Sequence, residues 1–281
     1  MLWKNLLSCE FNEAVKKAKG VCAIPIGCVE RHGDHLPLGC DTIWGAEFTR
    51  RAAEEAQVVV FPEMYFGEKS GAGEYPGTII FPTTLIWQIL EQSCYEIARN
   101  GFSKIVLLNS HGGNTSMLQA FARQILQKKP DFQVFVFDYG LPSLEKLLEH
   151  KEDFPYLTPE DLSCLEDYVK QKKKGGHGCF RETACCVDTC PELCKMENME
   201  RVDGKSIGRL NGLSAHSLYS PFVWMANFPN SLSADFHEGM NERIARAIGA
   251  VQTKKAADMF RFLKEETATT EYHAEWLKKQ K

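Results

Sequence analysis

The sequence predicts an α/β fold in which a mostly parallel sheet is flanked by helices. Apolar stretches of strand length alternate with amphipathic stretches of helix length through the first half of the chain. This alternation is typical of a parallel sheet whose strands are connected by helices on both faces. The 281 residues show no change in composition that would mark a second domain, so we expect a single domain over residues 1–281.

The same patterns predict the order of strands and helices. Strands are expected at residues 21–26, 58–61, 104–109 and 133–139. Helices are expected at residues 42–57, 84–100, 114–129, 144–149, 159–173, 181–190 and 239–266, with Thr84 and Asn114 as candidate caps. Residues 199–211 are expected to form a loop, because Gly204 and Gly208 weaken any regular structure there. Ligands of parallel sheets bind at the carboxyl ends of the strands, so function is expected in the segments that follow them.

The charge balance is nearly even, with 33 basic and 37 acidic residues and a formal net charge of −4. Because there is no basic excess, binding to nucleic acid is not expected. No apolar stretch approaches the ~20 residues that span a bilayer. The first residues also lack the pattern of a signal peptide. We therefore expect a cytoplasmic protein that does not enter a membrane.

The chain contains 11 cysteines, an odd number that suggests reduced thiols. Several of them lie close together in the sequence, between Cys179 and Cys194. A metal site is one interpretation of this group. However, the group contains no C-x-x-C pair, and a spacing of four residues on a helix also suits small buried side chains. A structural role is therefore favoured.

Residues 27–41 concentrate acidic and histidine side chains in a glycine-containing segment. Glu30 and His32 are two residues apart, so in extended backbone their side chains point to the same side. Asp41 follows after a turn set by Pro37. One such residue in a loop would be unremarkable, but carboxylate and imidazole together suit zinc, manganese or iron. Glu30, His32 and Asp41 are therefore candidate metal ligands.

Two further segments carry histidines beside glycines. His111 directly follows the strand at 104–109, where a histidine satisfied by backbone groups is the alternative interpretation. His177 lies in a glycine-rich loop, and Glu182 begins a helix five residues later. Taken alone, His177 fits an exposed loop residue equally well, and Glu182 fits the general preference for acidic residues in a first helical turn.

Together, the three segments resemble the signature of the creatininase family. Residues 30–41 match the family pattern E-x-H-G-x-H-L-P-L-x-x-D at every fixed position. The other matches are N-G/S-H-G-G-N at 109–114, P-G-T-I at 76–79, and H-A/G-G-x-x-E-T at 177–183 with Cys179 in place of the usual glycine. The first motif is highly specific, and the others are specific mainly in its company.

The resemblance implies a site with two divalent metal ions. Glu30, Asp41 and His111 resemble the ligands of one metal. His32 and Asp41 resemble ligands of the second, with Asp41 bridging the two ions. Some members also bind the second metal through a glutamate at the position that is Gly113 here.

Glu182 and His177 complete the implied site. Glu182 could supply the carboxylate that is missing at Gly113. His177 resembles the histidine that transfers a proton in the family. The glycines around His177 suggest a loop that moves over a substrate.

The activity implied is that of a metal-dependent amidohydrolase, which cleaves the C–N bond of a small amide or cyclic amide. A divalent metal lowers the pKa of bound water from ~15.7 to about 7, which provides hydroxide at neutral pH. Zinc is the expected metal, with manganese or iron as alternatives. A non-catalytic, metal-stabilised binding protein or subunit is the alternative that Gly113 and Cys179 suggest, and a phosphate-ester hydrolase is a weaker third hypothesis.

The resemblance narrows the substrate and the assembly only in part. Creatinine-acting members have tryptophans around the third motif, but this chain has none between residues 140 and 176, so creatinine is not expected. Deformylation of formamidopyrimidine-type compounds and peptide cleavage in cofactor maturation are other family activities. Members are commonly hexameric, so a homo-oligomer is expected. The apolar stretch at 219–228 fits a subunit contact about as well as core burial.

Overall fold

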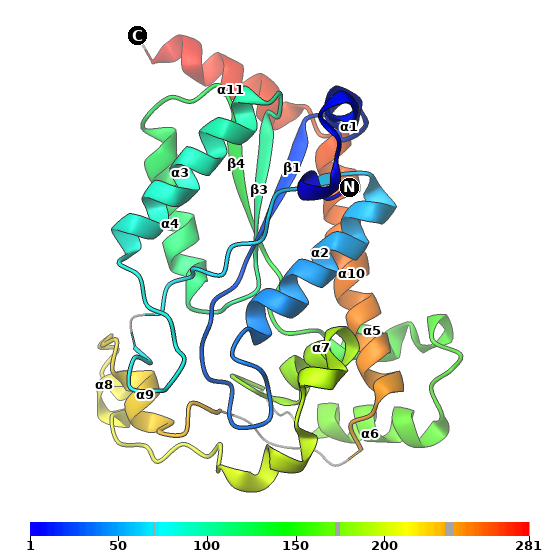
Figure 1. The fold of residues 1–281 in the computed structure, drawn as a ribbon. Helices are drawn as coiled ribbons and strands as arrows, with labels where there is room; N and C mark the ends of the chain where they lie inside the picture. Colours follow the sequence, from blue (N-terminus) through cyan, green and yellow to red (C-terminus); the bar gives the residue numbers. More distant parts are fainter. Residues whose placement is uncertain (70, 172–174, 234–238, 281) are drawn as a thin grey trace.

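The computed structural model describes residues 1–69, 71–171, 175–233 and 239–280. Its centre is a four-stranded parallel sheet with the strand order β2-β1-β3-β4 (Figure 1). The strands are β1 (Val21–Ile26), β2 (Val59–Val60), β3 (Lys104–Asn109) and β4 (Gln133–Asp138). The predicted α/β fold with a parallel sheet is confirmed. Because Ile26 pairs with Asn109, strands β1 and β3 end side by side at the same edge of the sheet.

Helices cover both faces of the sheet, as the alternation predicted. One face packs against α2 (Cys40–Ala56), α7 (Phe180–Thr189) and α10 (Glu242–Glu265). The other packs against α1 (Phe11–Lys17), α3 (Thr83–Arg99) and α4 (Asn114–Leu126), which include the helices on the left of Figure 1. Both faces of β1 and β3 are buried, which explains why these strands read as unbroken apolar stretches.

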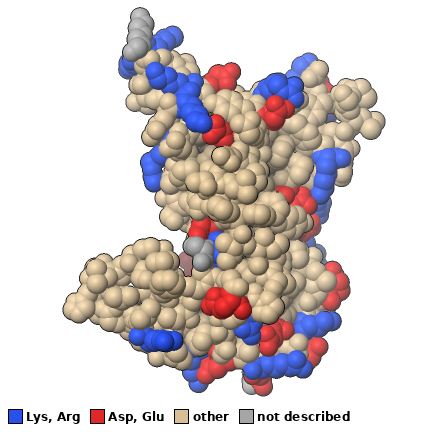
Figure 2. All heavy atoms as spheres, turned by 60° about the vertical axis from the view of Figure 1, so that its left-hand side comes forward, with Lys and Arg blue, Asp and Glu red and all other residues tan. Residues whose placement is uncertain are grey.

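The second half of the chain is largely helical. Below the lower end of the sheet lie α5 (Leu144–Glu149), α6 (Pro159–Lys170), α8 (Asn211–Ala215) and α9 (Val223–Asn227), whereas α11 (Ala268–Lys279) lies at the opposite, upper end (Figure 1). Short 3-10 helices occur at Trp3–Asn5, Ser8–Glu10, Lys151–Asp153, Pro191–Leu193 and Met196–Arg201. Figure 2 shows a hollow between the upper part of the molecule and a lower lobe on the left, whose surface carries few charged side chains.

Some sequence predictions differ from the structure in detail. The expected loop at 199–211 contains the end of a 3-10 helix and the first residue of α8. Helix α6 ends at Lys170, and residues 172–173 of its predicted span lie outside the described residues. The last predicted helix stops at Glu265, where extended backbone at Glu266 separates α10 from the unpredicted α11.

The predicted caps were wrong, because both residues lie inside their helices. Helix α3 begins at Thr83 after Pro82, so Thr84 is its second residue. Asn114 is the first residue of α4, and Gly113 precedes it. The Asn114 side chain instead joins two loops: it accepts from the backbone N–H of Glu68 at 2.6 Å and donates to the carbonyl of Gly27 at 3.2 Å. Within the described residues, no helix is both long and apolar enough to cross a membrane.

Candidate metal centre and pocket

The candidate residues meet at the carboxyl edge of the sheet, where ligands of parallel sheets bind. Glu30 and His32 follow β1, and His111 follows β3. Asp41 lies in the first turn of α2 and Glu182 in the first turn of α7, with His177 in the loop before α7. The structure brings together all six residues singled out from the sequence, and their side chains are largely buried.

Asp41 lies between two histidines and presents a different oxygen to each. Its Oδ1 is 3.2 Å from Nε2 of His32, and its Oδ2 is 2.9 Å from Nδ1 of His111. Oδ2 also accepts a hydrogen bond from the thiol of Cys28 at 3.2 Å. A carboxylate placed in this way can bridge two cations, one on each histidine.

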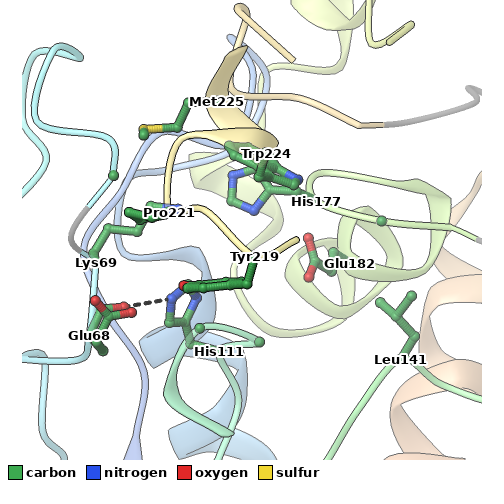
Figure 3. A pocket seen from close by; sticks show the side chains of 14 residues that line it. Glu68, Lys69, His111, Leu141, His177, Glu182, Tyr219, Pro221, Trp224 and Met225 are labelled. Carbon is green, nitrogen blue, oxygen red and sulfur yellow. Dashed lines mark hydrogen bonds between the residues drawn. The ribbon is translucent and has the colours of Figure 1, made fainter. Parts of the chain in front are cut away.

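The outer nitrogens of both histidines contact backbone carbonyls, and these contacts fix the ring tautomers. Nε2 of His111 is 3.0 Å from the carbonyl of Glu68, so this nitrogen carries a proton and donates it (Figure 3). Nδ1 of His32 is 3.2 Å from the carbonyl of Glu30 and donates in the same way. The other ring nitrogens are left facing the carboxylates, as metal-binding histidines require.

The electrostatics of this group favour positive charge among the carboxylates. Burial raises the pKa of Asp41, but His32 and His111 outweigh burial and hold that pKa well below its usual range. Burial raises the pKa of Glu30, but neighbouring histidines such as His111 outweigh burial and lower that pKa. Burial lowers the pKa of His32, yet Asp41 and other carboxylates raise it to about 10. The carboxylates are therefore ionised and attract cations.

His177 stacks on His32 with 3.9 Å between the ring centroids. Its Nε2 donates to the carbonyl of Arg31 at 2.6 Å, and its Nδ1 lies 3.7 Å from Oε1 of Glu30. Burial, and secondarily His32, lower the pKa of His177 to about 3, so the ring is neutral. The loop around it is tightly packed: an added Cβ at Gly176 would lie 2.3 Å from the Ser233 hydroxyl oxygen. In this structure the glycine serves close packing, whereas the sequence suggested loop motion.

Glu182 faces the same space from α7. Its Oε2 accepts a hydrogen bond from the backbone N–H of Gly178 at 2.6 Å and lies 3.8 Å from Nε2 of His32. Gly178 has a φ of +68°, a backbone conformation that residues with a side chain rarely adopt. This turn points the N–H of Gly178 at the carboxylate. Burial raises the pKa of Glu182 to about 7.

These side chains fit a divalent metal. Three overlapping groups have ligand atoms within 4.8 Å of one another, and all of their members are buried or half-buried: Cys28 with Glu30, Asp41 and His111; Glu30 with His32 and His177; and His32 with Cys40 and Asp41. Carboxylate and imidazole ligands suit zinc and manganese. Cys28 directly precedes the first motif and Cys40 lies within it, but neither was predicted as a metal ligand.

Comparison with known proteins assigns the family. The family model "Creatininase: Creatinine amidohydrolase" matches residues 4–261. The chain belongs to the creatininase family. It is 26% identical over 149 residues to a creatinine amidohydrolase of Pseudomonas putida, which covers 50% of this chain and 55% of that enzyme. It is 32% identical over 103 residues to a mycofactocin precursor peptide peptidase of Mycolicibacterium smegmatis, covering 34% of this chain and 41% of the peptidase. The matches thus span about half the length of these relatives.

Solved creatininase structures share the fold. A creatininase described as a manganese form aligns with a TM-score of 0.69 at 18% identity, covering 94% of this chain and 99% of that chain. A variant creatininase of Zn–Zn type aligns with a TM-score of 0.68 at 20% identity, covering 94% and 98%. At these identities the likeness establishes the fold, and the printed metals belong to those proteins.

The candidate metal centre opens into a pocket of about 440 Å³ (Figure 3). His111, His177 and Glu182 line it together with Lys69, Trp224 and Tyr219. Trp224 comes from α9 and lies edge-to-face against His177, with 5.1 Å between the ring centroids. The search for tryptophans between residues 140 and 176 therefore missed the aromatic wall of the pocket, which comes from later in the chain.

Gly113 occupies the position where the resemblance implied a glutamate in some family members, and here a side chain would meet its neighbours. A Cβ added at Gly113 would lie 2.5 Å from Nε2 of His111 and 3.0 Å from the carbonyl oxygen of Glu68. Any side chain would therefore disturb the hydrogen bond that orients His111. The hydrogen bond from His111 to the backbone thus requires glycine at position 113.

Proposed function

We propose that this chain is a metal-dependent hydrolase that cleaves the C–N bond of a small amide. The observation that carries the proposal is Asp41, whose two carboxylate oxygens face His32 and His111 separately. Membership of the creatininase family supports it, as does the relative named a creatinine amidohydrolase. The pocket beside these residues has room for a small molecule.

The proposal assigns two divalent metals to the buried ligand atoms. Glu30, Asp41 and His111 would hold one, and His32, Asp41 and Glu182 the other. Bound divalent ions polarise a substrate carbonyl and make hydroxide available near neutral pH. The backbone carbonyls of Glu68 and Glu30 would keep His111 and His32 in the required tautomers.

The remaining chemistry is proton transfer to the leaving nitrogen, which we assign to His177 and Glu182. The neutral ring of His177 would first accept a proton and then pass it to the leaving nitrogen. Both line the pocket. A proton donor must reach the leaving group within hydrogen-bond distance, and both side chains come from the same loop-helix junction. Trp224 would confine the substrate beside His177, because its ring forms the adjoining wall.

A peptide substrate is a second candidate. The observation in its favour is the 32% identity to a peptide peptidase. Tyr219, which lines the pocket, is also 92% exposed and could contact an extended chain. This candidate keeps the same metal ligands and changes only the part of the substrate outside the pocket.

One experiment tests the proposal against its alternatives. Metal-loaded and metal-stripped protein are assayed on small cyclic and N-acyl amides, on short peptides and on phosphate esters. We expect metal-dependent amide cleavage. Cleavage of phosphate esters alone would contradict it. Bound metal that raises the unfolding temperature without any turnover would instead favour a metal-stabilised binding protein.

A further inference from the structure

Lys69 introduces a buried positive charge into the candidate metal centre. Its ammonium group forms an ion pair with Oε2 of Glu30, and its side chain is only 13% exposed. The same ammonium lies 4.9 Å from the ring centroid of Trp224, within cation–π distance. Lys69 thus joins a candidate metal ligand to the aromatic wall of the pocket.

This ion pair and a metal compete for the same carboxylate. A buried ammonium needs a counter-charge, because desolvation otherwise costs several kcal/mol. In this structure Glu30 supplies that counter-charge through the ion pair. Once a divalent cation takes Glu30, the ammonium faces a cation and loses much of its counter-charge. A new anion beside Lys69 would replace the lost counter-charge.

The pocket indicates where that anion comes from. Among the described residues that line the pocket, Lys69 is the only lysine or arginine. Its ammonium lies between Glu30 and the ring of Trp224, in the wall of the pocket beside the candidate metal ligands. We propose that Lys69 binds a carboxylate of the substrate, so that the preferred substrates are amides carrying a carboxylate close to the scissile bond. This inference rests on the proposed function and names its substrate class.

The proposal predicts that metal and carboxylate bind cooperatively through Lys69. Thermodynamic linkage requires that a ligand which relieves the Lys69–cation repulsion also tightens the metal. Affinity for Mn²⁺ or Zn²⁺ is measured by competition with a chelator, with no addition, with N-acetylglycine, or with its uncharged analogue N-acetylglycinamide. In the unaltered protein we expect N-acetylglycine to tighten the metal about tenfold and the amide to have little effect, within the usual range of coupling.

Variants separate Lys69 from other sources of the effect. In Lys69→Met, N-acetylglycine should no longer tighten metal binding more than N-acetylglycinamide does. The metal alone should bind this variant more tightly, because the competing ammonium is gone. Lys69→Arg should keep part of the tightening by N-acetylglycine. Lys254→Met, which removes an exposed lysine of α10, is the matched control. Glu68→Gln tests the neighbouring acid of the pocket and leaves the backbone carbonyl that holds His111 in place.

Several results would overturn the proposal. Equal tightening by N-acetylglycine in the unaltered protein and in Lys69→Met would show that the carboxylate binds the metal directly. Equal effects of the two probes on the unaltered protein would show no carboxylate preference. Loss of metal from a folded Lys69→Met would show that Lys69 only holds Glu30 in place. The affinity measurement needs no turnover. A failure to find amide hydrolysis would therefore count against the proposed function but would not decide whether Lys69 binds a carboxylate.

Discussion

The imidazole of His111 presents Nδ1 to Oδ2 of Asp41 at 2.9 Å. The opposite nitrogen of the same ring is tied to a backbone carbonyl, so the ring cannot turn without losing that bond. The contact joins the segment after β3 to the first turn of α2. These segments are 70 residues apart in sequence, and the geometry of the candidate metal centre depends on their meeting.

The first prediction concerns Asp41. Asp41→Asn keeps the shape of the side chain but removes the charge that both histidines face. We expect the metal affinity at both positions to fall at least tenfold, while the fold is kept because the amide still fills the same space. Elemental analysis after dialysis measures the metal, and circular dichroism checks the fold. Full metal occupancy in this variant would contradict the bridging role.

The second prediction uses two neighbouring glycines. Gly113→Ala would place a methyl group 2.5 Å from Nε2 of His111, so His111 must move and metal affinity should fall by about tenfold or more. Gly112→Ala is the matched control, because a Cβ there meets nothing within 4 Å. Metal affinities of the two variants are compared on the same day. Similar affinities would show that the orientation of His111 does not depend on Gly113.

The sequence predicted strands β1 and β3 well because both are buried on both faces, whereas the strand expected at 58–61 is shorter, at Val59–Val60. Strands β1 and β3 have the expected bounds, since an unbroken apolar stretch marks each of them. Helix α11 was not predicted. Extended backbone at Glu266 separates it from α10, and no glycine or proline at this position indicates a break in the helix.

In the candidate site, too, some residues could be predicted from the sequence and others could not. Glu30, His32, Asp41 and His111 follow the strands within recognisable motifs, so a sequence pattern could find them. Lys69 and Trp224 could not be found in this manner. Their place in the pocket depends on how the segment after β2 and helix α9 lie across the sheet edge. Such long-range packing leaves no local pattern.

The third prediction separates proton transfer from metal binding. If His177 transfers a proton, His177→Ala should lower kcat by about 10²–10⁴-fold with metal content unchanged. If Glu182 is a ligand of the second metal, Glu182→Gln should lose about half of the bound metal. Turnover and metal are measured on the same preparations. Unchanged turnover in His177→Ala, or full metal in Glu182→Gln, would refute the respective assignment.

The last prediction concerns stability and lies outside the site. Asp161 closes the first turn of α6 by accepting from the backbone N–H of Thr158 at 2.9 Å. It also accepts two hydrogen bonds from the Arg243 guanidinium, at 2.7 and 3.0 Å, and one from Asn241 at 2.7 Å. Asp161 therefore fastens the start of α6 to the start of α10. Arg243 is half-exposed, which weakens the ion pair, so we expect Asp161→Asn to lower the free energy of unfolding by about 1–2 kcal/mol near neutral pH.

The pH dependence of this contact has a definite sign. The hydrogen bonds from Arg243 hold the pKa of Asp161 well below its usual range, although burial opposes them. A carboxylate with a lowered folded pKa stabilises the fold fully above its unfolded pKa of about 3.9, and this contribution is lost as the pH falls through the folded value. Urea unfolding between about pH 6 and about pH 3 should therefore show the difference between the unaltered protein and Asp161→Asn shrinking below about pH 4. Asp167→Asn on the same helix is the control, because Asp167 is 53% exposed and its contact with Lys170 is 3.5 Å long, so little change is expected at any pH. A difference for Asp161→Asn that stays constant down to pH ~3 would show that the ionised carboxylate contributes nothing beyond what the amide supplies.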